Sequence, residues 1–243
     1  MGIFSLFGKK NENDETKDPA RTPENGKPEE AAEPHADWFR KEEYEALVES
    51  KHGVRHVVAG VFGDDGGGKT LAVAALERTL TGGRTLWERW LQTPAEHNPV
   101  KYVDLPAEGC DYLLVDCPGQ PLTEADILAL GDAAAKMDLA VLILSWEDGI
   151  TPGDLRHMEL LKATGVPNTV VFLNKCDRCE DPELLDKMEE GARIGLNTLG
   201  LTFQGGPAPI LRGAALPVMQ ETESPWEAPL KELIGLIGQC AHE

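Results

Sequence analysis

The sequence predicts an α/β protein whose mainly parallel sheet is covered by helices on both faces. Short runs rich in Val, Leu and Ile have the length of buried strands, and segments with apolar residues at helical spacing lie between them. This alternation indicates a parallel sheet, because each helix returns the chain to the same edge of the sheet. The expected strands are 54–62, 111–116, 139–145, 168–174 and 208–213, and the expected helices are 69–80, 123–137, 153–164, 182–200 and 226–238.

Composition and charge restrict the class of protein. The apolar fraction of 41% over 243 residues is typical of a soluble globular protein, and no apolar run is long enough to span a bilayer. A net charge of −19 argues against a nucleic-acid-binding surface. The five cysteines are an odd number, so we expect reduced thiols in a cytoplasmic protein rather than a disulfide framework.

Three parts are expected along the chain. Residues 1–36 are polar, acidic and rich in proline, which predicts disorder. Residues 37–52 predict a helical lead-in, and 53–243 form the α/β domain. Residues 1–10 combine apolar and basic side chains, and two interpretations of them are open. They are either a flexible terminus or a weak anchor for a partner or a membrane surface, which would place the protein at the membrane periphery.

A glycine-rich loop follows the first expected strand and fits the pattern G-x-x-x-x-G-K-[ST]. Its glycines let successive backbone N–H groups turn toward phosphates, and the next helix directs its N-terminus at them. Lys69 is expected to neutralise the outer phosphates and to assist catalysis, and Thr70 to bind Mg²⁺. Asp64 and Asp65 occupy variable positions, where side chains can face solvent while their N–H groups serve the ligand. The expected loop is Gly63, Asp64, Asp65, Gly66, Gly67, Gly68, Lys69 and Thr70, followed by Leu71.

Two later strands end in residues that suit a guanine nucleotide. Asp116 can hold Mg²⁺ through water, and the N–H of Gly119 can approach the terminal phosphate because no side chain blocks it. At the end of the fourth strand, the Asp177 carboxylate can accept two hydrogen bonds from guanine, a donor pair that adenine lacks. Asn174 is expected to tie this loop to the phosphate loop, and the stem of Lys175 to lie over the base. The ordered motifs predict a P-loop NTPase with a Ras-like G domain.

From about residue 54 onward the chain resembles the nucleotide-binding domain of elongation factor Tu. The segments that carry this resemblance are "DCPG", "MDLAVLILSWEDGITPGDLRHMELLKATGVPNTVVFLNKCD", "PILRGAAL" and "WEAPLKEL". The resemblance implies GTP or GDP as ligand, Mg²⁺ as cofactor, and a fifth nucleotide loop that contacts the guanine O6 through its backbone. Ala214 replaces the usual serine of that loop, so one side-chain contact is missing. The implied loop residues are Gly213, Ala214, Ala215 and Leu216.

Three departures from that family bear on function. The sequence ends at Glu243 without the family's two β-barrel domains, which argues against tRNA delivery and leaves a ribosome-linked role resting on ancestry alone. The first switch lacks the Gly-Ile-Thr segment whose threonine binds Mg²⁺, and Thr93 is the nearest candidate. Gln120 replaces the histidine of translation factors and resembles the glutamine that orients the attacking water in small signalling GTPases.

Two functional interpretations follow. The first is a slow GTPase that acts as a regulatory switch with an unknown protein effector or regulator, and Gln120 favours it. The second is a non-hydrolysing guanine-nucleotide-binding module that scaffolds a partner, and the missing switch threonine and the Asp64–Asp65 pair favour it. We expect the first, with Gln120 and Lys69 as catalytic residues.

Overall fold

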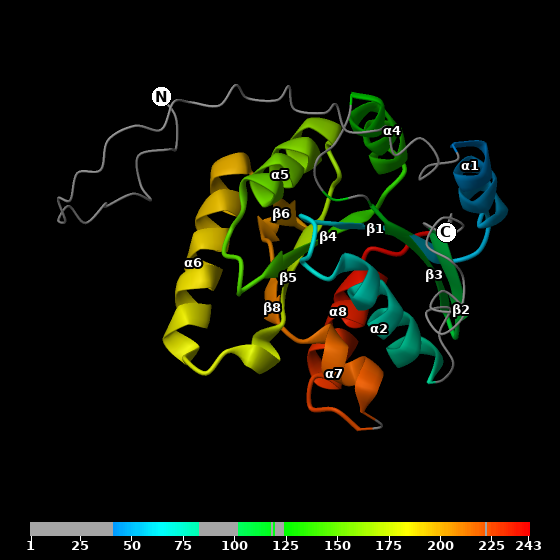
Figure 1. The fold of residues 1–243 in the computed structure, drawn as a ribbon. Coiled ribbons are helices and arrows are strands. Elements are labelled where there is room, and N and C mark those ends of the chain that lie inside the picture. Colours follow the sequence, from blue (N-terminus) through cyan, green and yellow to red (C-terminus); the bar gives the residue numbers. More distant parts are fainter. Residues whose placement is uncertain (1–40, 83–101, 118, 120–123, 222) are drawn as a thin grey trace, which may run out of the picture. The chain divides into compact units, whose positions relative to one another are not determined.

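A six-stranded sheet forms the centre of the protein (Figure 1). The computed structural model describes residues 41–82, 102–117, 119, 124–221 and 223–243, which lie in one compact unit. The strand order is β2-β3-β1-β4-β5-β8, and every neighbouring pair is parallel except β2 with β3. The predicted α/β class with a mainly parallel sheet is therefore confirmed. The strands are β1 (His56–Phe62), β2 (Tyr102–Ala107), β3 (Cys110–Asp116), β4 (Leu139–Ser145), β5 (Thr169–Asn174) and β8 (Ile210–Arg212).

Helices cover both faces of this sheet. α4, α5 and α6 lie on one face, and α2, α7 and α8 lie on the other (Figure 1). A short hairpin of β6 (Thr202–Phe203) and β7 (Gly206–Pro207) follows α6. The helices are α1 (Lys41–Ser50), α2 (Lys69–Thr81), α4 (Glu124–Ala134), α5 (Pro152–Thr164), α6 (Pro182–Leu199), α7 (Ala215–Gln220) and α8 (Glu227–Gly238). None of these helices is both long and apolar enough to span a membrane.

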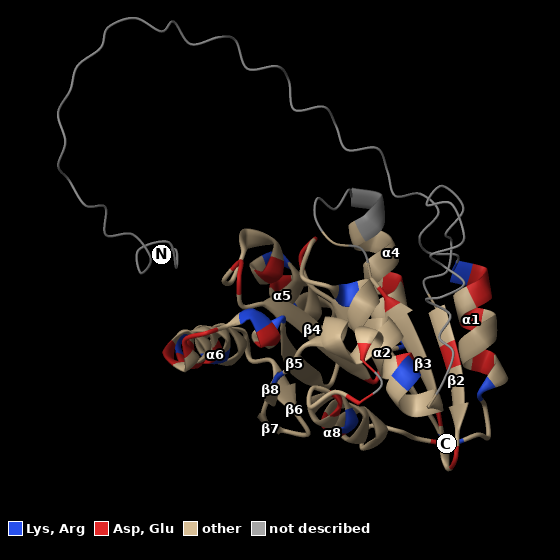
Figure 2. Ribbon diagram, turned by 60° about the horizontal axis from the view of Figure 1, so that its bottom comes forward, with Lys and Arg blue, Asp and Glu red and all other residues tan. Residues whose placement is uncertain are grey.

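The two faces of the sheet build two separate apolar cores. Alternate residues of a strand point to opposite faces, so Val58 of β1 packs with α4 and α5, while its neighbour Val57 packs with α2 and α8. Strands β4 and β5 are buried along their whole length, as expected for strands covered on both faces. Figure 2 shows these two strands without charged residues, which lie instead mainly on helices and loops.

Strand β2 is missing from the expected strands. It is antiparallel to β3 at the edge of the sheet, with Val103 and Leu105 buried and Asp104 and Pro106 exposed. Only one face of this edge strand is covered, so only two of its side chains are buried. The proline fits there because some backbone N–H groups of an edge strand have no partner strand to bond. Such a short alternation is a weak signal in the sequence.

Helix α1 packs against the edge of the sheet and against α4. Tyr44 is fully buried, its ring stacks on Tyr102 at 5.5 Å between centroids, and its hydroxyl donates to the Ala133 carbonyl at 3.1 Å. Just after the helix, the buried Lys51 pairs with Asp104 at 2.6 Å and with Asp111 at 2.9 Å. The part of the expected lead-in that the structure describes is thus a helix fixed to β2, β3 and α4.

Candidate functional site

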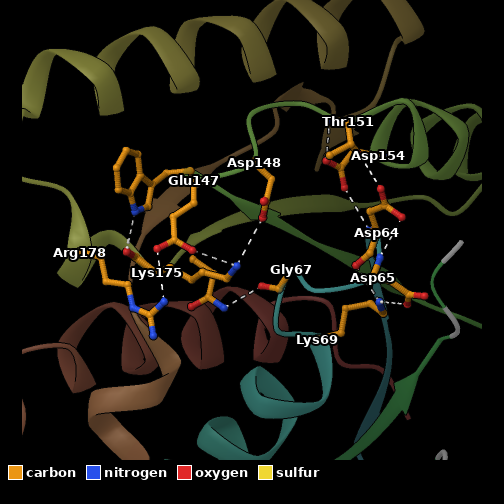
Figure 3. A network of polar contacts seen from close by, with 12 residues as sticks. Asp64, Asp65, Gly67, Lys69, Glu147, Asp148, Thr151, Asp154, Lys175 and Arg178 are labelled. Atoms are coloured by element: carbon orange, nitrogen blue, oxygen red, sulfur yellow. Dashed lines mark hydrogen bonds and ion pairs between the residues drawn. The ribbon is translucent and has the colours of Figure 1, made fainter.

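The candidate site lies where β1, β3, β4, β5 and β8 end. In a parallel sheet these carboxyl ends share one edge, which is where α/β folds bind ligands. Figure 3 shows two groups of polar contacts there. One group surrounds the loop between β1 and α2, and the other surrounds the loop after β5. A ligand that touches both groups would therefore contact both loops.

The loop between β1 and α2 has the backbone that a phosphate loop needs. Gly68 has a φ of 92°, which L side chains rarely adopt, and a Cβ there would lie 2.5 Å from the Asn174 Nδ2. α2 begins immediately afterwards, and no side chain caps its first N–H groups. The start of this helix therefore presents uncapped N–H donors of the kind that bind anions.

Lys69 and Thr70 begin α2 beside the end of β3. The Lys69 side chain is 8% exposed, and its Nζ donates to the Asp64 carbonyl at 2.9 Å. The Thr70 hydroxyl donates to Asp116 Oδ2 at 2.6 Å. Two oxygens from different elements, one of them a carboxylate, are thus adjacent at the phosphate loop. Hydroxyl and carboxylate oxygens are the ligands that Mg²⁺ prefers, so this pair fits the ion that the sequence predicts.

The expectation that Asp64 faces solvent is wrong. Its Oδ2 accepts from the Thr151 hydroxyl at 2.7 Å, and its backbone N–H donates to Asp154 Oδ1 at 3.1 Å (Figure 3). No sequence pattern predicts this contact, because the partners are some 90 positions away at the start of α5. Position 153 is a glycine, and a Cβ there would overlap the Asp64 carboxylate. The loop is therefore fastened to α5, and the Asp64 N–H is already bonded within the protein.

Asp65 is placed differently. Its side chain is 72% exposed, its Oδ1 lies 3.7 Å from the Lys69 Nζ, and its N–H donates to Asp64 Oδ1 at 2.8 Å. The N–H groups of both aspartates thus bond to carboxylates of the protein, contrary to the expectation that they face the ligand. Asp65 nevertheless remains next to the lysine that is expected to bind the outer phosphates.

Asn174 joins three of the loops. This residue is 2% exposed, its Nδ2 donates to the Gly67 carbonyl at 2.9 Å, and its Oδ1 accepts from the Ala215 N–H at 3.0 Å. The expected tie between the loop after β5 and the phosphate loop is therefore present. The second bond adds the loop after β8 to the same connection, and the sequence does not predict this bond.

An acidic segment after β4 surrounds Lys175. The Lys175 Nζ lies 3.2 Å from Glu147 and 3.3 Å from Asp148, and Glu147 also pairs with Arg178 at 3.3 Å. Hydrogen bonding to Lys175 lowers the pKa of the Glu147 carboxyl. The indole N–H of Trp146 donates to the Lys175 carbonyl at 2.7 Å. These contacts hold both the backbone and the amino group of Lys175. They join segments that are far apart in the sequence, so no local pattern predicts them.

The other expected residues fall at the same edge. Asp177 is exposed in a short 3₁₀ turn, Cys176–Arg178. The turn is bonded to the loop after β8, because the Cys176 N–H donates to the Gly213 carbonyl at 3.0 Å. Ala214 and Ala215 are buried, and Leu216 is half-buried in the first turn of α7. Gly119 is buried beside the phosphate loop, with its backbone against Asp65.

Some expectations lie outside the described residues. These are the catalytic candidate Gln120, the switch candidate Thr93 and the segment 1–10. Among the residues that the structure does describe, no cluster of three or more His, Cys, Asp or Glu side chains has the arrangement of a metal site. A metal ion at Thr70 and Asp116 would therefore need further oxygens from nucleotide or water, as Mg²⁺ commonly does.

Comparison with known families agrees with the architecture. The family model described as "Elongation factor Tu GTP binding domain" matches residues 88–223, more than half of the chain. The matched range contains the ends of β3, β5 and β8, whereas the phosphate loop lies before it. That loop is therefore identified by its motif and geometry, and membership of this family supports GTP binding. The chain belongs to the elongation factor Tu GTP-binding domain family.

Proposed function

We propose that this chain binds GTP and GDP with Mg²⁺, hydrolyses GTP slowly, and acts as a regulatory switch toward a protein partner. The observation that carries the proposal is the double hydrogen bond of Asn174. It connects the loop that would hold phosphates to the two loops that would hold guanine. A buried amide in this position makes the two ends of the site one rigid unit, which suits a ligand with a phosphate end and a base end.

Each end of the site has its own task. Lys69 and the first N–H groups of α2 bind the phosphates, and the exposed Asp177 carboxylate accepts from the guanine N1–H and 2-amino groups. Thr70 and Asp116 hold the Mg²⁺, which reduces the negative charge on the phosphate oxygens when it is bound. The buried thiol of Cys176 takes no part, because burial raises its pKa to about 11 and it stays protonated.

Hydrolysis needs one water and one leaving group. The water attacks the terminal phosphorus, the bond from this phosphorus to the bridging oxygen breaks, and GDP leaves with the bonding electron pair. One proton of the water passes to a phosphate oxygen or to solvent, which leaves inorganic phosphate. In the proposal Gln120 orients the water, and Lys69 stabilises charge on the oxygens of the transferred group. The missing switch threonine makes this step slow, so binding is the main property and turnover the secondary one.

Calorimetry tests binding directly. Titrations of the purified chain with GTP, GDP and ATP, each with and without Mg²⁺, are expected to give guanine-selective, Mg²⁺-dependent binding. Asp177→Asn is expected to reduce the preference for guanine over adenine by at least about tenfold, because an amide cannot accept both hydrogen bonds. Equal affinity for ATP and GTP, or no binding at millimolar GTP, would refute the proposal.

Single-turnover measurements test hydrolysis separately. With GTP pre-bound, native protein is expected to release phosphate over minutes to hours, and Gln120→Leu to bind GTP equally well without releasing phosphate. Tight GTP binding with no phosphate release over hours in the native chain would instead establish a non-hydrolysing module.

A further inference from the structure

The carboxylate of Asp65 lies between Lys69 and Gly119. Its Oδ1 is 3.7 Å from the Lys69 Nζ. On its other side the side chain meets the backbone of Gly119, where a Cβ would overlap the Asp65 Oδ1 and would lie 2.9 Å from the Asp65 nitrogen. The Asp65 carboxylate therefore fills the space beside Gly119 that a side chain at position 119 would enter. Three segments thus meet at one anionic oxygen: the phosphate loop, the start of α2 and the segment after β3.

In the proposed function, these two neighbours of Asp65 belong to the third phosphate. Lys69 neutralises the outer phosphates, and the Gly119 N–H approaches the terminal one. A carboxylate oxygen and a phosphoryl oxygen are both anionic acceptors, so they compete for the same donors and repel each other at short distance. The Asp65 side chain therefore lies beside the two groups that the proposed function assigns to a terminal phosphoryl group.

The backbone at this position cannot simply move away. The Asp65 N–H is held by the Asp64 carboxylate at 2.8 Å, and Asp64 is itself fixed to Thr151 and Asp154 on α5. The exposed side chain can still rotate into solvent. Binding a third phosphate thus means rotating Asp65 away from Lys69, or placing two anions side by side. A diphosphate brings no third phosphoryl group to the Gly119 side of Asp65, so the carboxylate can stay there.

We infer that Asp65 is a specificity-determining residue of this site, whose carboxylate occupies the place of the third phosphate and so favours GDP over GTP. The inference rests on the proposed function and adds a regulatory consequence to it. In the native chain, binding of GTP carries the cost of displacing Asp65 or of placing two anions side by side, so the diphosphate-bound state predominates when both nucleotides are present at equal concentration.

The test compares affinities for GDP and for a slowly hydrolysed GTP analogue, measured by calorimetry with Mg²⁺ in the full chain. Asp65→Asn keeps the shape and removes the charge, whereas Asp65→Gly removes both. In both variants the ratio of the triphosphate Kd to the diphosphate Kd is expected to fall by about tenfold. Asp132→Asn is the matched control, because it makes the same charge change on α4, where Asp132 pairs with Lys41. It is expected to leave the ratio unchanged.

Each outcome separates the two proposals. Ratios that stay within about twofold of the native value in both Asp65 variants, with both nucleotides bound, overturn the inference and leave the proposed function standing. A native preference for the triphosphate also overturns it. A native chain that binds neither nucleotide refutes the proposed function itself. Thermal unfolding without nucleotide checks that the Asp65 variants fold, which their exposed position predicts.

Discussion

At the scale of single residues, Asn174 fixes the relative positions of three loops of the site through its two side-chain hydrogen bonds. Asn174→Ala would leave the Gly67 carbonyl and the Ala215 N–H without their buried partner, at a cost of about 3 kcal/mol in the free energy of unfolding. Nucleotide affinity is expected to fall at least about tenfold, because the two ends of the site separate. Urea unfolding and calorimetry measure the two effects.

Asn168, at the opposite end of β5, provides a matched control. Its side chain also bonds two backbone groups, the Asp138 carbonyl at 2.9 Å and the Gln204 N–H at 2.9 Å, but far from the loops of the site. Asn168→Ala is expected to reduce stability by about 1 kcal/mol and to leave nucleotide affinity unchanged. If both variants weakened nucleotide binding equally, Asn174 would have only a general structural role.

His157 makes the stability of the fold depend on pH. This residue of α5 is fully buried, and its ring packs against Phe62 at the end of β1. Burial lowers its pKa from 6.5 to about 4; the nearby Lys69 charge acts in the same direction, and Asp64 acts in the opposite one. Between pH 6.5 and about pH 4, His157 is protonated in the unfolded chain but neutral in the folded one. Stability is therefore complete above pH 6.5 and falls as the pH drops toward 4, by up to about 3 kcal/mol.

The variant His157→Leu is expected to lose this part of the pH dependence. Urea unfolding of both proteins at pH 7 and at pH 4.5 gives the difference that belongs to His157. Comparison with the variant is needed because burial also raises the pKa of Asp154, which titrates in the acidic range as well. An identical loss of stability in the two proteins would show that His157 is not the group responsible.

At the scale of elements, the N-terminus of α5 both caps a helix and fastens the phosphate loop. The Thr151 hydroxyl accepts from the Asp154 N–H at 3.0 Å and donates to Asp64 at 2.7 Å. Thr151→Ala removes the cap and the fastening together. We expect a loss of about 1 kcal/mol in stability and a severalfold weaker affinity for nucleotide.

The cap of α6 separates these two effects. The Asp181 side chain accepts from the Glu183 N–H at 3.0 Å and has no described contact with the phosphate loop. Asp181→Ala is expected to cost a similar amount of stability with unchanged nucleotide affinity. Equal affinities in the two variants would mean that the Asp64–Thr151 contact does not position the loop.

The same element shows what could be predicted from sequence and what could not. The loop of 63–70 and the ends of the expected strands could be predicted, because each is a local pattern: a run of apolar residues followed by a few polar residues or glycines. The links from Asp64 to Thr151 and from Lys175 to Glu147 join distant segments whose spacing obeys no periodicity. Only the folded arrangement of β1, β4, β5 and α5 brings these residues together.

At the scale of the whole molecule, the net charge of −19 opposes the approach of an anionic nucleotide. The long-range repulsion is screened as salt shortens the Debye length from about 30 Å at 0.01 M to about 8 Å at 0.15 M. The association rate constant for GDP is therefore expected to rise severalfold over this range. Stopped-flow mixing at several salt concentrations measures it, and a fall with salt would show that the local field of Lys69 dominates.

The place of Trp146 gives the chain its own optical reporter. Its indole N–H is bonded to the carbonyl of Lys175, the residue whose stem is expected to lie over the base. A purine ring that arrives there changes the polarity and stacking around the indole, so the intrinsic fluorescence should change when guanosine nucleotides bind. Trp146→Phe should remove that signal, and an unchanged signal would assign it to another of the five tryptophans.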